Sequence, residues 1–140
     1  MDVDAALEFI RHNHHGVLAT LRRDGTPQLS PIDAGVDAAG RIVISTREPA
    51  MKARNLRRDP RAWLCVFPDS FYPRDGRSHV QVDADAEVVS LPEAMEGLVD
   101  YYRGISGEHP DWDDYRAAMA RDRRCLIRLV VTRAGPDAAG

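Results

Sequence analysis

The sequence predicts a small, mainly β (α+β) fold in which six antiparallel strands form a barrel and helices lie at its periphery. Short apolar runs separated by turn signals recur along the chain. Residues 80–87 alternate strictly between apolar and polar side chains, which is the period of a half-exposed strand. At 140 residues the chain makes about one domain. We assign residues 1–133 to this domain and residues 134–140 to a flexible C-terminal tail.

The first helix and the first two strands follow from periodicity and turn residues. Apolar side chains at i, i+3, i+4 and i+7 predict an amphipathic helix over residues 2–13. The short apolar run 17–21 predicts the first strand. Asp24-Gly25 is a hairpin signal, so we expect residues 27–36 to return as the second strand.

The middle of the chain predicts two further strands around a basic helix. Residues 41–45 form a buried strand, and the following helix has Pro49 in its first turn, where the missing N–H costs nothing. The helix ends at Asp59 because a proline at position 60 disfavours helical geometry in the residue before it. Residues 62–67 predict the fourth strand. The loop after it carries Phe71 and Tyr72, which either pack down or cover a ligand.

The last third of the chain completes the prediction with a strand, two helices and a strand. Residues 80–90 predict the fifth strand and residues 93–103 a helix. Asp111 starts another helix, whose acidic first turn suits the helix dipole. Residues 126–131 predict the sixth strand. Cys65 and Cys125 lie far apart in apolar strand-like segments, which indicates two reduced thiols in the core.

Composition and charge exclude several classes of protein. A hydrophobic content of 44% with 29% charged residues is ordinary for a globular domain. No apolar run approaches the roughly 20 residues of a membrane span. The acidic N-terminus is unlike a signal peptide, so we expect a cytoplasmic protein. A formal net charge of −3 argues against general nucleic-acid binding.

Positive charge is concentrated in residues 47–61, which carry a net charge of +4 while the rest of the chain carries −7. A strand here delivers Ser45 and Thr46 to the start of a helix, where free N–H groups and the helix dipole favour anions. Lys52, one turn into the helix, is the only lysine among 18 arginines. The segment is therefore either a phosphate site or a solvated basic face.

The common catalytic motifs are absent from the sequence. It contains no G-x-S-x-G, P-loop, G-x-G-x-x-G or C-x-x-C pattern. His12 and His14 point to different faces of a helix, so we predict no metal site. His79, at the start of the fifth strand, is either a ligand contact or an edge residue. If the protein is an enzyme, a bound cofactor performs the difficult step.

Three segments carry a family resemblance: residues 16–28, residues 52–61 with Lys52-x-Arg54-Asn55-Leu56, and residues 102–116 with Gly107-Glu108-His109. In this order they resemble the pyridoxamine 5′-phosphate oxidase-like split β-barrel family. More narrowly, they resemble the branch that binds the deazaflavin coenzyme F420 in place of FMN. The similarity covers nearly the whole chain.

The resemblance implies a homodimer with two cofactor clefts at the subunit interface, which agrees with a chain too small to enclose a nucleotide-sized ligand alone. It places the cofactor phosphate at the strand-to-helix segment, and the ring system along the first two strands. Relatives often carry a second basic residue where this chain has Ala50, and Arg47 is the candidate replacement. With His79, the implied cofactor-binding residues are Ser45, Thr46, Arg47, Lys52, Asn55, Leu18, Ala19, Thr20, Gln28, Ser30 and Pro31.

The function implied is an F420-dependent oxidoreductase that transfers a hydride from reduced deazaflavin to a small electron-poor acceptor of the quinone, enone or tetrapyrrole type. No residue is identified as a proton donor. The alternatives are an FMN-dependent oxidoreductase of the same fold and a non-catalytic protein that binds or carries F420. We predict no nucleic-acid or membrane partner.

Overall fold

The computed structural model describes residues 1–69 and 78–137, and the described strands form one antiparallel sheet in the order β2-β1-β5-β6-β7-β4-β3. The strands are β1 (His15–Leu21), β2 (Pro27–Asp33), β3 (Gly35–Val36), β4 (Ile42–Arg47), β5 (Arg61–Val66), β6 (Val80–Val89) and β7 (Arg124–Gly135). The helices are α1 (Val3–His12), α2 (Met51–Arg58), α3 (Met95–Ser106) and α4 (Trp112–Arg121).

The second strand differs from the prediction in a way that shapes the whole sheet. Residues 27–36 were expected to form one strand, but the chain bends at Ala34 and separates β2 from β3. The Ala34 N–H donates to the His14 carbonyl at 2.8 Å, and β2 and β3 are the two edges of the sheet. Because consecutive residues occupy opposite edges, the sheet must curl round. The fold is therefore a split barrel of seven described strands rather than six.

Other boundaries shift by a few residues. Pro49 lies outside α2, because the Ala50 N–H donates to the Arg47 carbonyl at 3.0 Å and closes a turn before the helix begins. Strand β7 is longer than predicted, and its residues 134 and 135 pair with β6. The ordered strand thus enters the segment assigned to the tail. Phe71 and Tyr72 lie outside the described residues.

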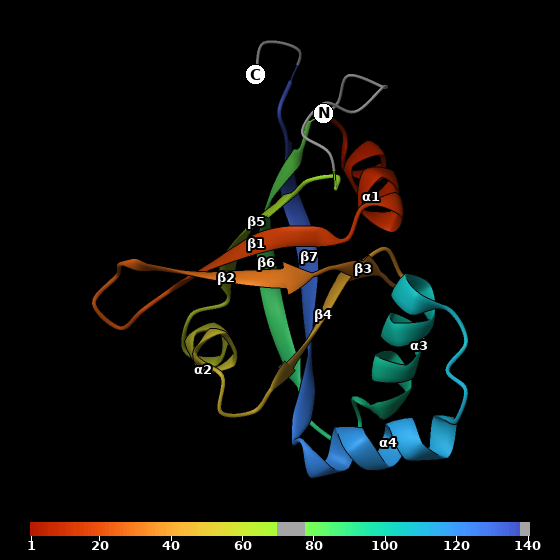
Figure 1. Cartoon of the computed structure of the whole chain (residues 1–140). Helices are drawn as coiled ribbons and strands as arrows, with labels where there is room; N and C mark the ends of the chain where they lie inside the picture. Colours follow the sequence, from red (N-terminus) through yellow and green to blue (C-terminus); the bar gives the residue numbers. More distant parts are fainter. Residues whose placement is uncertain (70–77, 138–140) are drawn as a thin grey trace.

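The main core fills the barrel. Strand β4 turns Ile42 and Ile44 inward, and α1 packs Leu7 and Ile10 against the same cluster. Helix α2 contributes Leu56. In Figure 1, α1 and α2 lie at different ends of the curled sheet. The helices therefore cover apolar surface that the open barrel leaves exposed.

A second core lies outside the barrel, between the sheet and the pair α3 and α4. Val43 of β4 and Leu126 of β7 pack there against Leu98 and Tyr115. Strand β4 is thus buried on both faces, which explains its continuous apolar run. Figure 1 shows α3 and α4 beside β4 and β7, away from α2. None of the helices in the described ranges is long and apolar enough to cross a membrane.

Candidate functional site

A cavity of about 900 Å³ lies on the outer surface of the split barrel. Its walls come from β1 and β2, the end of β4, the start of α2, the start of β7 and the helices α3 and α4. This volume lies at the upper end of the range of small-molecule sites. We call it the main cavity.

One end of the main cavity is cationic. It brings together Ser45, Thr46, Lys52 and Arg124. Burial lowers the pKa of Lys52, and the nearby Arg124 guanidinium lowers it further. The Arg124 Nε is buried and has no hydrogen-bond partner among the described residues. Two neighbouring cations beside two hydroxyls fit a phosphate group, which would supply the missing acceptor.

Tyrosines from α3 and α4 form another wall of the main cavity. The Tyr101 hydroxyl donates to the Asp33 carbonyl at 2.9 Å, and the Tyr115 hydroxyl donates to the Leu98 carbonyl at 2.7 Å. Burial is the main cause that raises the pKa of both groups to about 12. With their protons committed to carbonyl groups, these tyrosines are suited to shape the wall and are poor acids.

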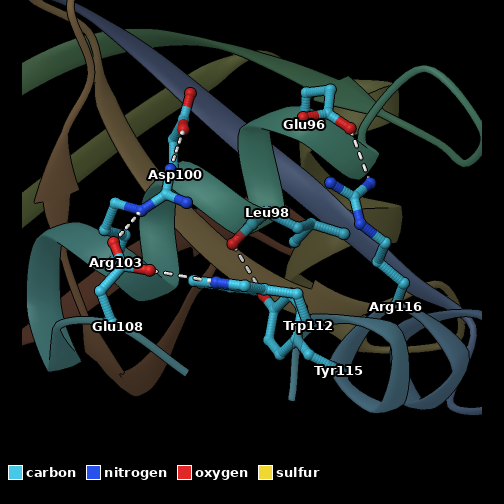
Figure 2. A network of polar contacts seen from close by, with 8 residues as sticks. All are labelled: Glu96, Leu98, Asp100, Arg103, Glu108, Trp112, Tyr115 and Arg116. Carbon is cyan, nitrogen blue, oxygen red and sulfur yellow. Dashed lines mark hydrogen bonds and ion pairs between the residues drawn. The ribbon is translucent and has the colours of Figure 1, made fainter. Parts of the chain in front are cut away.

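The segment that joins α3 to α4 holds this wall in place (Figure 2). The Glu108 carboxylate accepts from Arg103 Nε at 2.7 Å and from Trp112 Nε1 at 3.1 Å. The Arg103 guanidinium lies 4.9 Å from the centre of the Trp112 ring. Tyr102 and Tyr115 pack with the rings of His109 and Trp112. The third segment of the family resemblance therefore builds the cavity wall.

Close backbone approach shapes the side of the cavity formed by β1. A Cβ atom on Gly16 would lie 2.5 Å from the Cys65 carbonyl oxygen on β5, so only glycine fits here. Nearby, His15 Nδ1 lies 2.8 Å from an Asp33 carboxylate oxygen, and His15 Nε2 lies 3.2 Å from Asp69. These contacts put a polar rim on the cavity.

Four of the predicted cofactor residues form a hydrogen-bond chain instead of lining the main cavity. Asn55 Nδ2 donates to Thr20 Oγ1 at 3.1 Å, Thr20 Oγ1 donates to Gln28 Oε1 at 3.3 Å, and Gln28 Nε2 donates to Ser30 Oγ at 2.9 Å. Arg58 donates to Asn55 Oδ1 at 3.0 Å. We call these residues the polar chain. The polar chain connects α2 to the hairpin of β1 and β2.

The other predicted site residues are dispersed. Pro31 lines the main cavity, whereas Leu18 is fully buried in the barrel core. Ala19 is half-buried on the outer face of β1, beside Leu29. Arg47 Nε donates to the Asp122 carbonyl at 3.2 Å. His79 lines a different cavity of about 280 Å³, between the start of β6 and the end of β7.

Sequence reasoning missed three important residues of the main cavity: Arg124, Tyr101 and Tyr115. The signal for Arg124 was available, because residues 121–124 contain three arginines directly before an apolar strand. The register then pairs Arg124 with Arg47 and Cys125 with Thr46. This pairing places β7 beside the strand-to-helix segment. The sequence alone does not show it, because it depends on the order of strands in the sheet.

The two cysteines are free thiols. Burial raises the pKa of Cys65, and burial raises the pKa of Cys125 to about 11. Both thiols are therefore poor nucleophiles at neutral pH. Cys125 is buried as the sequence predicted, whereas Cys65 is only half-buried and is not part of the core.

The curled antiparallel sheet and its cationic cavity define a split β-barrel of the kind that binds flavin-type cofactors. A family model described as "Pyridoxamine 5'-phosphate oxidase" matches residues 3–135, and the chain belongs to this family. The predicted family and fold class are thus confirmed.

Solved structures agree with this assignment. A conserved hypothetical protein from Mycobacterium tuberculosis is 28% identical, with a TM-score of 0.76 over 96% of this chain and 82% of that chain. A protein described as an F420 reductase is 22% identical, with a TM-score of 0.68 over 91% and 94% of the two chains. A heme binding protein from Mycobacterium smegmatis is 24% identical, with a TM-score of 0.65 over 92% and 52%. The last two similarities concern the fold.

Proposed function

We propose that this protein binds the deazaflavin coenzyme F420 in the main cavity and acts as an F420-dependent oxidoreductase. The observation that carries the proposal is the pair Lys52 and Arg124, two cations that line one cavity end with no ion pair to any described residue. The resemblance of three segments to the deazaflavin branch and the fold shared with an F420 reductase support the choice of cofactor.

When bound and reduced, F420 supplies a hydride to an electron-poor acceptor such as a quinone, an enone or a tetrapyrrole. The chain's own residues bind, orient and exclude water. Lys52, Arg124 and Ser45 hold the phosphate end. Tyr101 and Tyr115 form a wall that keeps solvent from one side of the ring system.

We also propose that a second copy of the chain completes the cavity. The outer face of β1, β2 and β5 is apolar where a solvated sheet carries polar residues. Leu29 is 64% exposed there, and Ala19 pairs with both Leu29 and Trp63. Val17 and Pro31 continue this face into the main cavity. Light scattering should give twice the chain mass, and Leu29→Glu should lower it.

Two alternatives share this cavity. FMN also carries a phosphate and a flat ring system, and the fold of this family binds flavin-type cofactors. A carrier that stores F420 without turnover needs the same contacts. Contacts to the phosphate and the ring system are the same for F420 catalysis, F420 storage and FMN binding, so an experiment has to distinguish the three functions.

The deciding experiment is a titration of the purified protein with F420 and with FMN, followed by single-turnover oxidation of reduced F420 with a panel of quinones, enones and tetrapyrroles. The proposal predicts tighter binding of F420 and oxidation that is faster with at least one acceptor than without protein. Tighter binding of FMN assigns the cavity to a flavin. Tight F420 binding without acceleration by any acceptor identifies a carrier.

A further inference from the structure

A second cavity, of about 800 Å³, lies next to the main cavity. Tyr101 lines both and forms their shared wall. The remaining walls come from the end of α1, from β3 and the turn after it, from the outer face of β4 and β7, and from α3. None of Ser45, Lys52 and Arg124 lines this space, so it is separate from the proposed phosphate site.

Among the described residues that line the second cavity, Arg128 is the polar side chain without a hydrogen-bond or ion-pair partner. Its Nε is buried and has no hydrogen-bond partner within the described part of the chain. In the sheet register Arg128 lies between Val43 on β4 and Glu87 on β6. Glu87 is exposed, and no ion pair joins it to Arg128 among the described contacts. A buried donor left without an acceptor is costly, which indicates that the missing acceptor belongs to a ligand.

The acids around the second cavity are already paired and do not neutralise Arg128. Each carboxylate that lines the cavity lies near a different arginine: Asp37 at 2.8 Å from Arg41, Glu96 at 2.6 Å from Arg116, and Asp100 at 3.5 Å from Arg103. Arg11, which also lines the cavity, lies 3.2 Å from Glu8. Arg128 is thus the lining guanidinium without an ion pair in the described ranges, and it favours an anion.

The floor beside Arg128 is apolar. Val36, Val43 and Leu126 line the cavity there. Helix α3 approaches this floor closely at Gly97, where a Cβ atom would lie 2.5 Å from a Leu126 methyl carbon and 3.6 Å from Arg128 Nη2. Arg128 and Leu126 are therefore held at the base of the cavity, next to one another, by the helix above them.

We propose that the second cavity binds a small organic anion, with a carboxylate at Arg128 and an apolar or aromatic body over Val43 and Leu126. A bidentate contact with the guanidinium satisfies the buried Nε and supplies charge neutralisation. Tyr101 separates this ligand from the cofactor. The site does not depend on which cofactor occupies the main cavity.

The first test is a ¹⁹F NMR titration of the cofactor-free protein with 4-fluorobenzoate and with its neutral isostere 4-fluorobenzamide. We expect the carboxylate to bind roughly tenfold or more tightly than the amide, as the loss of one charge-assisted contact implies. Arg128→Gln should remove this preference. The control Arg133→Gln, the same change at an 84% exposed side chain on the same strand, should keep it. Equal binding of the two probes, or an unchanged preference in Arg128→Gln, overturns the proposal.

The second test needs no variant and therefore holds even if Arg128→Gln fails to fold. Methyl resonances are followed during the benzoate titration of the unmodified protein. Shifts should concentrate at Val43 and Leu126, which line the second cavity. Shifts concentrated instead at Val17 and Met119, which line the main cavity, place the anion there and contradict the proposal.

Discussion

Helix α2 carries two polar side chains, three residues apart, that face different environments. Asn55 is 1% exposed and has both ends of its amide satisfied, by Thr20 and Arg58. Lys52 lines the main cavity, and burial beside Arg124 lowers its pKa. Among the described residues Lys52 has no ion-pair partner. Both residues were predicted to contact the cofactor, yet one is satisfied by the protein and the other is not.

This difference distinguishes polar residues that stabilise the fold from polar residues that bind a ligand. Satisfied buried groups hold elements together, because breaking their hydrogen bonds leaves a buried partner unpaired. Polar groups that are partly buried and lack a partner are candidates for ligand binding, because a ligand can provide the hydrogen-bond or ion-pair partner that the protein does not. By this criterion Arg124 belongs with Lys52, and Thr20 belongs with Asn55.

The largest effect is expected from removal of either cation of the main cavity, and Arg124→Gln is the first case. Loss of one charge-assisted contact with the phosphate should cost about 1.5–3 kcal/mol of binding, or roughly ten- to more than hundredfold in F420 affinity. The melting temperature without ligand should not fall, because the Arg124 Nε makes no hydrogen bond to a described residue. Isothermal titration and thermal melting measure the two effects. Arg133→Gln is the control, and a variant with unchanged affinity would show that Arg124 does not face the phosphate.

Asn55→Ala should have the opposite profile. It leaves the Thr20 hydroxyl and the Arg58 guanidinium short of one partner each, so we expect a loss of about 1–3 kcal/mol in the free energy of unfolding. Urea unfolding measures this loss. F420 affinity of the folded variant should stay within about twofold of the unmodified protein.

Asn13→Ala is the matched control, because Asn13 is half-buried and its amide nitrogen donates a single hydrogen bond, to the Phe9 carbonyl at 3.0 Å. It should cost less than Asn55→Ala. If Asn55→Ala is as stable as the unmodified protein and yet binds F420 weakly, Asn55 contacts the cofactor and the polar chain is not a scaffold.

The smallest effect concerns pH. The pKa of Lys52 in the free protein is lowered from 10.5, and an anion beside the ammonium should raise it again. F420 affinity should therefore be constant at neutral pH and fall as the pH rises through this lowered pKa. The pH dependence of stability has the opposite sign. Lys52 keeps its proton to higher pH in the unfolded chain than in the folded protein, because its folded-state pKa is lowered. Its contribution to the free energy of unfolding therefore rises with pH between the lowered pKa and 10.5.

F420 titrations between neutral pH and about pH 10 test this prediction. In the control Lys52→Ala, the fall in F420 affinity with rising pH should be absent. An identical pH profile in both proteins would assign the dependence to another group.

The family and the fold class were predictable because they depend on local signals. The alternation in residues 80–87, the Asp24-Gly25 turn and the three family segments each lie within a short stretch. The cationic end of the cavity was predictable in part, since Ser45, Thr46 and Lys52 are close in sequence. These three residues do line one cavity.

The rest depended on contacts between distant segments. Arg124 joins Lys52 through the pairing of β4 with β7, and Thr20 meets Asn55 because α2 packs on β1. The break at Ala34 has one local signal, Gly35 directly after it, but the chain forms a strand on both sides, so the sequence still looks like one continuous strand. A strand pattern in the sequence does not reveal which edge of a sheet each half joins.

The central claim, that Lys52 is a ligand-binding cation on a helix otherwise held by structural contacts, is tested most directly by comparing Lys52→Ala with Arg54→Ala. Both changes remove one positive charge from α2, and Arg54 is exposed and lies outside the main cavity. F420 affinity and the ligand-free melting temperature are measured for each. The account predicts a roughly ten- to more than hundredfold loss of affinity for Lys52→Ala alone, with both melting temperatures nearly unchanged. Equal losses of affinity in the two variants would show that the helix acts only through diffuse charge and would contradict the account.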